Sequence, residues 1–373
     1  MRSRIKHVGK LAEVKVLAPI AQLDFARGGR ARSGRGIPSR LWDEEIEVFH
    51  PSWIYPPGGN AINPAFLFLR LLPLAARIRK DFEFDLIDSH FAFPDGIAAA
   101  LLARRLGVRF SVTLRGSELL HAQYPRRRKF MGWALRRASA VIALSEELKV
   151  FAVSLGADAA RVKVIPNGID PAIFYPRDRD RCRAKHGINR ERKIVLSAGS
   201  LIELKGHHRT VKAVAAIRAK GLDVEFLIAG GAGRAVQYEP EIRKQVADSE
   251  LQDRVRLLGE IPPDDLAELM CAADVFCLAS SREGWPNVVH EALACGTPVV
   301  ATRVGAVAEM IPSSDYGFVV PPGEVEALSK ALREALEKEW DGAVISRLAQ
   351  ARTWTQTASE AIDFLRQRAA VGK

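Results

Sequence analysis

The chain has 373 residues, of which 48% are hydrophobic and 27% charged, and it carries a net charge of +11. This composition is typical of a globular protein, and the length predicts two or three domains that each bury a core. No apolar run reaches the roughly 18–20 residues of a membrane span, and the four cysteines form no Cys-x-x-Cys pair. We therefore expect neither a membrane-spanning protein nor a disulfide scaffold. With no secretory signal at its start, we expect the chain in the cytoplasm.

The positive charge is concentrated in one half of the chain. Residues 1–165 hold 27 Lys and Arg against 15 Asp and Glu, whereas the remainder is nearly balanced. A basic half attracts anionic lipid, a phosphorylated acceptor or nucleic acid. Because no zinc-finger spacing or RNP-type aromatic motif is present, we expect no nucleic acid and favour an anionic membrane surface or a diphospholipid acceptor. The alternative is that the excess charge only aids solubility.

Strands alternate with helices along the first half, which predicts a parallel sheet. A helix end is expected at residues 2–11 and a Gly/Arg-rich loop at residues 27–36. The patterns predict helices at 66–80 and 97–106, and strands at 14–18, 46–50, 84–88, 109–114, 140–143 and 162–165.

The segment 124–137 (YPRRRKFMGWALRR) interleaves basic residues with Phe130, Met131, Trp133 and Leu135. This pattern predicts an amphipathic helix at a membrane interface and weak peripheral binding to anionic bilayers. The alternative, that the apolar residues face the protein core, stays open from the sequence.

A turn-rich linker at 166–176 (PNGIDPAIFYP) marks the expected domain boundary. Beyond it, apolar runs predict a second α/β unit, and the two Rossmann-like units are expected to form a ligand cleft between them. Cys271, Cys277 and Cys295 lie in apolar surroundings, which predicts small core residues. The six parallel strands are expected at 194–198, 225–229, 255–258, 275–279, 299–302 and 317–320.

The most informative segment is 280–298, SSREGWPNVVHEALACGTP. Glu283 is expected on the loop that follows a buried strand, and Glu291 about one turn into the next helix. Ligands bind at this edge of open α/β sheets, and the free N–H groups at a helix start suit a phosphate. Two carboxylates on either side of a phosphate can accept hydrogen bonds from hydroxyl groups at both ends of a ligand. A nucleotide-sugar, with its ribose, diphosphate and hexose, has that layout.

The longer run SSREGWPNVVHEALACGTPVVATRVG resembles the signature of the retaining glycosyltransferases of family 4. Within that family it is most similar to the branch of teichuronic-acid and other cell-surface polysaccharide transferases. The resemblance implies an α/β fold of GT-B type, with two Rossmann-like domains facing across a cleft. It implies an acceptor-side domain at 1–168, a nucleotide-sugar domain at 169–352, and a C-terminal helix at 353–373 that packs back on the first domain. Relatives begin with a strand and a Gly-rich loop, and we expect this chain to lack both.

By the same resemblance, Lys205 in the run AGSLIELKG neutralises the donor diphosphate as it leaves, as a cation does in a dry cleft. Glu283 would accept hydrogen bonds from the transferred sugar, and Glu291 from the ribose. The other donor-binding residues that the resemblance implies are Gly199, Ser200, Gly259, Glu260, Gly284, Trp285, Asn287 and Val288.

The chain departs from the family at one cationic position. Relatives often carry arginine at the place of Ser200 or of Leu204, and this chain has neither. We expect another basic residue, such as Arg209 or Arg282, to supply that charge.

On the acceptor side, the run TLRGSE ends a strand and places Arg115 and Glu118 where many relatives have His and Asp. Arg115 cannot accept a proton at neutral pH, so we expect it to bind an acceptor phosphate or carboxylate. It completes the expected catalytic group with Lys205 and Glu283. His90, on another loop, is expected to shape the acceptor site, and a structural role for it is equally open.

The sequence therefore predicts a retaining glycosyltransferase that moves a sugar from a nucleoside diphosphate sugar to a glycan or lipid-linked acceptor in surface polysaccharide synthesis. We expect no metal, because no Asp-x-Asp triplet follows an expected strand, and no NAD, because Gly230–Gly233 does not fit the dinucleotide pattern. Two alternatives stay open: a sugar-nucleotide-binding protein without catalysis, and a sugar-nucleotide epimerase of GT-B type.

Overall fold

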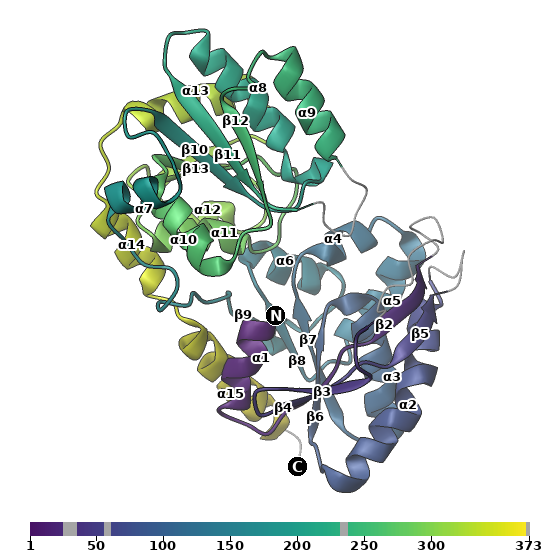
Figure 1. Cartoon of the computed structure of the whole chain (residues 1–373). Coiled ribbons are helices and arrows are strands. Elements are labelled where there is room, and N and C mark those ends of the chain that lie inside the picture. The colour runs from purple at the N-terminus through teal and green to yellow at the C-terminus, as the bar shows by residue number, and fades with distance from the viewer. Residues whose placement is uncertain (25–35, 56–60, 232–237, 371–373) are drawn as a thin grey trace. The chain divides into compact units, whose positions relative to one another are not determined.

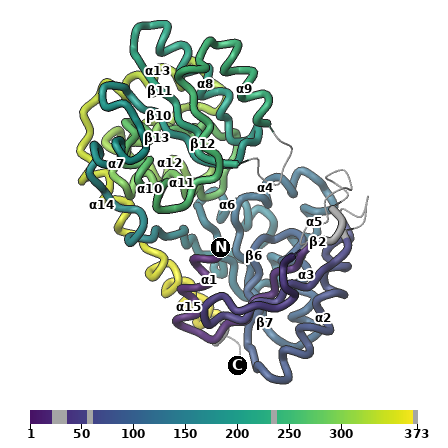
Figure 2. Tube along the Cα trace, viewed as in Figure 1, coloured from purple at the N-terminus to yellow at the C-terminus, as the bar shows by residue number. Residues whose placement is uncertain are grey.

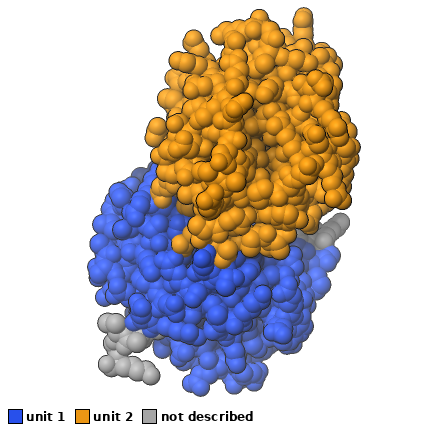
Figure 3. Space-filling view, turned by 90° about the vertical axis from the view of Figure 1, so that its left-hand side faces the viewer, with its two compact units in different colours: residues 1–168, 354–373 blue, residues 169–353 orange. Residues whose placement is uncertain are grey.

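The computed structural model describes residues 1–24, 36–55, 61–231 and 238–370. The chain divides into two compact units (Figure 3). Unit 1 comprises Met1–Gly168 together with Trp354–Lys373, and unit 2 comprises Ile169–Thr353. Residues 27–35 of the expected Gly/Arg-rich loop lie outside the described residues, as do Ala232 and Gly233 of the glycine run.

Unit 2 is built on a six-stranded parallel sheet (Figure 1). All six expected strands are present, and the spatial order is β12-β11-β10-β13-β14-β15. The chain starts in the middle at β10, adds strands outward on one side, and then returns to add β13 beside β10. The strand order reverses between β10 and β13, so the loops that leave these two strands diverge at their carboxyl ends, which is where ligands bind in open α/β sheets. The strands are β10 (Lys193–Ala198), β11 (Val224–Ala229), β12 (Val255–Gly259), β13 (Val275–Leu278), β14 (Val299–Thr302) and β15 (Gly317–Val320).

Helices cover both faces of this sheet. Alternate residues of β10 belong to different cores: Ile194 and Leu196 pack with helices α10, α11 and α14, whereas Val195 packs with α8, α9 and α13. Burial on both faces is the reason that these strands are continuous apolar runs in the sequence. The helices are α7 (Arg179–Lys185), α8 (His207–Arg218), α9 (Glu239–Asp248), α10 (Pro263–Ala272), α11 (Asn287–Ala294), α12 (Val307–Met310), α13 (Val325–Glu337) and α14 (Gly342–Gln350).

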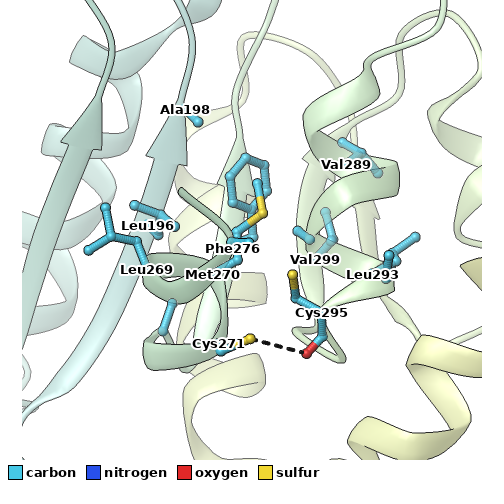
Figure 4. Packing of buried hydrophobic residues seen from close by; sticks show 14 of the residues in the cluster. Leu196, Ala198, Leu269, Met270, Cys271, Phe276, Val289, Leu293, Cys295 and Val299 are labelled. Atoms are coloured by element: carbon cyan, nitrogen blue, oxygen red, sulfur yellow. Dashed lines mark hydrogen bonds between the residues drawn. The ribbon is translucent and has the colours of Figure 1, made fainter. Parts of the chain in front are cut away.

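One of these cores fixes the position of helix α11 (Figure 4). Val289 and Leu293, one turn apart on α11, are fully buried in the cluster that contains Phe276 of β13. Each such side chain contributes about 1.5–3 kcal/mol through burial. Cys271 and Cys295 are small members of the same core, and the Cys271 thiol donates a weak hydrogen bond to the Cys295 carbonyl. The expectation that these cysteines are core residues is confirmed.

Unit 1 differs from the single parallel sheet that the sequence predicts. It contains a four-stranded parallel sheet, β6-β7-β8-β9, a three-stranded sheet, β1-β4-β3, and a parallel pair, β2-β5. Strand β3 runs antiparallel to β4, so the three-stranded sheet is mixed. The strands are β1 (Lys15–Leu17), β2 (Ile20–Asp24), β3 (Arg40–Asp43), β4 (Ile46–Phe49), β5 (Ser52–Tyr55), β6 (Leu86–His90), β7 (Arg109–Leu114), β8 (Ala140–Ala143) and β9 (Val162–Val164).

The strands that the sequence analysis missed are β2, β3 and β5. Each has only four or five residues, and Trp42 of β3 and Ile54 of β5 are exposed. Short segments of this kind are defined by the backbone pairing that they make with another part of the chain. Their side chains therefore carry no apolar alternation strong enough to predict them.

The helices of unit 1 agree better with expectation. The predicted helix at 97–106 has those bounds, and the one at 66–80 begins three residues earlier and continues through Pro73. Helix α15 packs Ala361, Phe364 and Leu365 against β8 and Ile165, so this helix belongs to the core of unit 1. Figure 2 shows the trace of α15 beside that of α1. The helices are α1 (Arg2–Gly9), α2 (Asn63–Asp81), α3 (Ile97–Leu106), α4 (Ser117–His121), α5 (Pro125–Leu135), α6 (Glu146–Ser154) and α15 (Trp354–Ala370).

Helix α5 corrects part of the expectation of an interfacial helix. Met131 and Leu135 are fully buried, so the main apolar side of α5 faces the protein core. Phe130 and Tyr124 are exposed among basic residues. Among the described residues, no helix is both long enough and apolar enough to cross a bilayer.

Candidate active site

The two loops at the reversal point of the unit 2 sheet bring an ion pair together. Lys205 ends the short helix Glu203–Lys205 after β10, and Glu283 lies on the loop after β13. Lys205 Nζ donates to Glu283 Oε1 at 2.7 Å. Both side chains are mostly buried, with exposed fractions of 21% and 11%. Two residues that the sequence analysis proposed separately therefore form one unit at the edge of the sheet where ligands bind.

Close backbone contact between the two loops holds Lys205 and Glu283 within pairing distance. Gly206 follows Lys205 with a φ of 71°, and a Cβ at this position would lie 2.0 Å from the Ala279 carbonyl oxygen. Only glycine fits both the left-handed conformation and the short distance. The Ser281 amide also donates to the Leu204 carbonyl at 2.9 Å. These contacts fix the distance between the Lys205 loop and the Glu283 loop.

Two buried hydroxyl groups orient the Glu283 carboxylate. Ser280 is fully buried, and its Oγ donates to Glu283 Oε1 at 2.7 Å. Thr302 of β14 donates from Oγ1 to the Ser280 carbonyl at 2.5 Å. Because Lys205 and Ser280 both use Oε1, Oε2 stays available to accept hydrogen bonds from a ligand. Neither hydroxyl residue was predicted as a site residue, and the only signal for one of them is the position of Ser280 three residues before Glu283.

Glu291 lies on the outer side of α11. The buried residues of the helix, such as Val289 and Leu293, lie on the core side, so Glu291 shares the other side with Asn287 and Val288. The Glu291 carboxylate makes no hydrogen bond or ion pair with any residue that the structure describes. Burial without a partner raises the pKa of Glu291 to about 7. A carboxyl group in this state gains most when a ligand supplies hydroxyl donors to it.

Several expected donor-binding residues lie around the same edge through their backbones. Gly199 follows β10, and a Cβ there would contact the Lys205 side chain at 3.4 Å. The Gly230 amide donates to the Gly259 carbonyl at 2.7 Å, which joins the ends of β11 and β12. Glu260 is exposed and lies over Gly231, where an added Cβ would be 2.6 Å from Glu260 Cγ. These glycines let the Lys205 and Glu260 side chains and the neighbouring backbone lie close together at this edge.

Trp285 links the loop that carries Glu283 to the core. Its ring packs edge-on against His290, with centroids 6.0 Å apart. His290 in turn bonds through Nε2 to the Ala349 carbonyl at 3.0 Å. The Ala306 amide donates to the Gly284 carbonyl at 3.0 Å. Trp285 therefore anchors this loop, and its buried Nε1 has no hydrogen-bond partner among the described residues.

Arg209 and Arg282 are the candidates to replace the arginine that relatives carry, and they differ in whether the guanidinium already has a partner. Arg209 Nη1 donates to the Ala279 carbonyl at 3.2 Å, so its guanidinium already braces the end of β13. Arg282 is half-buried next to Glu283 and has no hydrogen bond or ion pair within the described part of the chain. Of the two candidates, Arg282 is therefore the one whose guanidinium has no existing hydrogen-bond partner among the described residues.

Among the acidic residues that the structure describes, two groups resemble metal sites, and in both of them carboxylates already make other contacts. His186, Asp265 and Glu268 lie close enough to share an ion, but Lys185 Nζ already donates to both carboxylates, at 3.1 and 2.6 Å. One Asp-x-Asp triplet occurs, at Asp178–Asp180, and it begins helix α7. There Asp178 accepts the Arg181 amide at 2.7 Å as an N-cap, and the triplet does not follow a strand.

The expected acceptor-side residues come together within unit 1, at the carboxyl ends of β6 and β7. Arg115 Nε donates to His90 Nδ1 at 3.3 Å. Glu118 is fully buried, and its carboxylate accepts the amides of Ala92, Arg115 and Gly116 at 2.7–3.1 Å. Because these three amides use the carboxylate, Glu118 positions the Arg115 loop and is not free to hold an acceptor itself.

His90 is a neutral imidazole in this arrangement. Burial lowers the pKa of His90 to about 3, although Asp88 lies 3.6 Å from its Nε2. Its Nδ1 accepts from Arg115, so the ring proton is on Nε2, facing Asp88. The imidazole therefore orients Arg115 and has no basic nitrogen left over.

Comparisons with known proteins cover most of the chain. Residues 178–353 match the family model described as Glycosyl transferases group 1, and residues 14–173 match Glycosyltransferase Family 4. A 2-deoxystreptamine glucosyltransferase of Streptomyces kanamyceticus is 30% identical over 79% of this chain and 78% of its own length. A Bacillus subtilis protein described as a teichuronic acid biosynthesis glycosyltransferase is 29% identical over 79% and 72%. The teichuronic-acid branch is thus one of several similar groups, and the expectation that it stands out was too narrow.

Solved structures agree with the fold. Sucrose-phosphate synthase of Thermosynechococcus elongatus superposes with a TM-score of 0.82 at 21% identity, covering 98% of this chain and 92% of its own. HepE of Anabaena, solved with UDP and glucose, gives a TM-score of 0.70 at 25% identity, covering 86% of each chain. Both α/β units of this chain therefore have counterparts in glycosyltransferases of the GT-B fold.

Proposed function

Since the chain belongs to the family 4 glycosyltransferases of GT-B fold, we propose that it transfers a sugar from a nucleoside diphosphate sugar to a glycan or lipid-linked acceptor. The transfer retains the anomeric configuration, needs no metal ion, and serves the synthesis of a surface polysaccharide. The observation that carries this proposal is the Lys205–Glu283 ion pair at the reversal point of the unit 2 sheet. HepE, which was solved with UDP and glucose, supports a nucleotide-sugar donor.

Each donor-side residue has a defined task in this reaction. Glu283 Oε2 accepts hydrogen bonds from hydroxyls of the transferred sugar, and Glu291 accepts those of the ribose. Lys205 moves its positive charge toward the diphosphate as the glycosidic bond breaks and negative charge develops on the leaving oxygen. The leaving phosphate takes the acceptor proton on the same face of the sugar, which delivers the acceptor with retention. Arg282 adds the second cation that relatives obtain from an arginine before the lysine.

The test is a panel of nucleoside diphosphate sugars followed by a transfer assay. The matching donor at 100 times its Kd is expected to stabilise the folded protein by about 2.7 kcal/mol, which is measurable as a rise in Tm. Radiolabel from that donor should then enter a lipid-linked or glycan acceptor, with equal rates in EDTA and in magnesium. NMR of the first turnover product should show the anomeric configuration of the donor.

The same assay separates the alternatives. A binding protein without catalysis would bind the donor and leave it intact. An epimerase would convert the donor when no acceptor is present. Either result, or a rate abolished by EDTA, would contradict the proposed reaction.

We also propose that unit 1 binds anionic membranes, through helix α2 and not through the apolar residues of α5. Ile62, Phe66 and Leu69 precede and begin α2 at helical spacing, and their exposed fractions are 55%, 41% and 62%. Arg70 and Arg77 lie on the exposed side of the same helix. An apolar stripe beside arginines on a basic domain favours the surface of an anionic bilayer.

Replacing Phe66 and Leu69 with serine is expected to abolish flotation with vesicles that contain phosphatidylglycerol, because the double variant removes most of the apolar contact. The matched control replaces Val150 and Val153 of α6, which are exposed at the same spacing. Binding of the native protein should weaken between 0.05 and 0.5 M salt, as electrostatic attraction is screened. Equal flotation of both double variants would contradict the assignment to α2.

A further inference from the structure

Arg4, Asp88, His90 and Arg115 form a cluster in unit 1. One hydrogen-bond donor of this cluster has no partner among the described residues. We infer that Arg115, held in place by His90 and close to the positive charge of Arg4, binds an anionic group of the acceptor, either a phosphate or a carboxylate. The inference rests on the proposed function in naming the acceptor as the source of this group. The cluster lies at the carboxyl ends of β6 and β7, and all of its members belong to unit 1.

Arg115 has donors left over. Its Nε donates to His90, but its Nη2 is buried and has no hydrogen-bond partner among the described residues. A buried donor without an acceptor costs roughly 1–3 kcal/mol, more when it is charged. Because the partner at Nε is a neutral imidazole, the hydrogen bond to His90 holds the guanidinium in place but supplies no negative charge, and Arg115 has no ion pair among the described residues. A group that brings both negative charge and acceptor oxygens removes both costs.

Nearby carboxylates do not fill this role. Glu118 accepts three backbone amides and forms no ion pair with Arg115 within the described part of the chain. Asp88 accepts the Ser111 hydroxyl at 2.7 Å and lies 3.7 Å from Arg4 Nη2. Asp88 is therefore the counter-ion of Arg4. Asp88 and Glu118 both act electrostatically on Arg115, but neither forms an ion pair with it within the described part of the chain.

Arg4 closes the cluster from helix α1. It is 2% exposed, and its Nη1 donates to Thr113 Oγ1 at 3.0 Å. Burial lowers the pKa of Arg115 to about 10, and the positive charge of Arg4 contributes to the same shift. Two guanidinium groups this close repel each other, and an anion bound at Arg115 relieves that repulsion. Arg4 and Thr113 were not predicted as site residues, because Arg4 is 109 positions from Thr113 in the chain.

Phosphate and carboxylate share the chemistry that the cluster recognises, and they differ in shape and charge. Guanidinium groups bind either one through paired N–H donors. Only Nη2 is buried without a partner, so we expect a modest affinity, with a Kd for inorganic phosphate on the order of 1 mM. An acceptor that carries such a group would gain this contact in addition to those of its sugar.

The test uses inorganic phosphate and malonate as separate probes. Binding of each probe is measured by NMR line broadening at pH 7.5 and low salt. Arg115→Met is expected to weaken binding of the preferred probe at least tenfold, and Arg115→Lys should retain part of it. Arg104→Met removes the same charge from an exposed position on α3 and should bind like the native protein. Lys205→Met removes the expected donor-side cation, and the binding that depends on Arg115 should persist in it.

Three results would overturn the inference. They are equal binding by the native protein and Arg115→Met, no binding of either probe, and an equally large loss of nucleoside diphosphate affinity in Arg115→Met. The last would assign Arg115 to the donor diphosphate. A melting temperature within a few degrees of the native value verifies that each variant folds. The binding probes need no sugar transfer, so a failure to bind them is distinguishable from a failure of the transfer assay. A transferase that uses neutral acceptors would be active in the transfer assay and would not bind the probes.

Discussion

Replacing Glu283 with alanine is expected to lower kcat/KM by about 10²–10³-fold, because the variant loses the acceptor for the sugar hydroxyls and releases Lys205 from its fixed position. The Lys205–Glu283 contact is 2.7 Å long, and Ser280 holds the same carboxylate oxygen. Lys205→Met is expected to have an effect of similar size, since it removes the charge that stabilises the leaving diphosphate. Both rates are measured with the donor identified by the panel.

A double-mutant cycle shows whether the two residues act as a unit. If they do, the double variant should lose little more activity than either single variant. Binding measurements separate the tasks of the two residues. Lys205→Met should weaken binding of the free nucleoside diphosphate, whereas Glu283→Ala should weaken only binding of the sugar-bearing donor. Glu326→Gln and Lys330→Met, at exposed positions of α13, serve as matched controls. Unchanged turnover in Glu283→Ala would refute its role.

Donor affinity is expected to rise as the pH increases through about 7, because only the ionised Glu291 accepts hydrogen bonds from both ribose hydroxyls. Burial raises the pKa of this carboxyl from 4.5 to about 7, so near neutral pH it is only partly ionised. The measurement is the Kd of the nucleoside diphosphate from pH 5.5 to 8.5. Glu291→Gln should remove this pH dependence and weaken binding most at high pH.

The diphosphate of the ligand also titrates in this range, so a second ligand is needed. A nucleoside diphosphate without ribose 2′ and 3′ hydroxyls keeps the phosphate titration and loses the contact with Glu291. The native protein should show the additional rise with pH only for the hydroxylated ligand. The same rise for both ligands, or its persistence in Glu291→Gln, would contradict the assignment.

The free energy of unfolding of the ligand-free protein should fall as the pH rises, opposite to the expected rise in donor affinity. A carboxyl whose pKa is higher in the folded than in the unfolded state binds more protons when folded between pH 4.5 and 7, so its contribution to stability falls as the pH rises through this range. Glu291→Gln has no charge to bury. Its free energy of unfolding should therefore exceed that of the native protein at pH 8, on the order of 1–3 kcal/mol, and match it near pH 4.

Strand and helix positions in unit 2 followed from local sequence. Its strands are continuous apolar runs because they are covered on both faces. In unit 1 the strands β2, β3 and β5 were not predictable in this way. They are short, and the first half of the chain uses them in mixed and two-stranded sheets that depend on pairing between distant segments.

The sequence by itself determined the α/β class, the six strands of unit 2 and the segment that carries Glu283 and Glu291, since these depend on residue types and spacings over a few turns. Only the tertiary structure decided that Lys205 contacts Glu283 across 78 positions, that Ser280 orients the carboxylate, and that Glu118 serves its own loop. It also decided that α5 turns Met131 and Leu135 inward. The physical reason is that hydrogen-bond partners and buried faces depend on the order in which strands join a sheet, and periodicity along the chain does not encode that order.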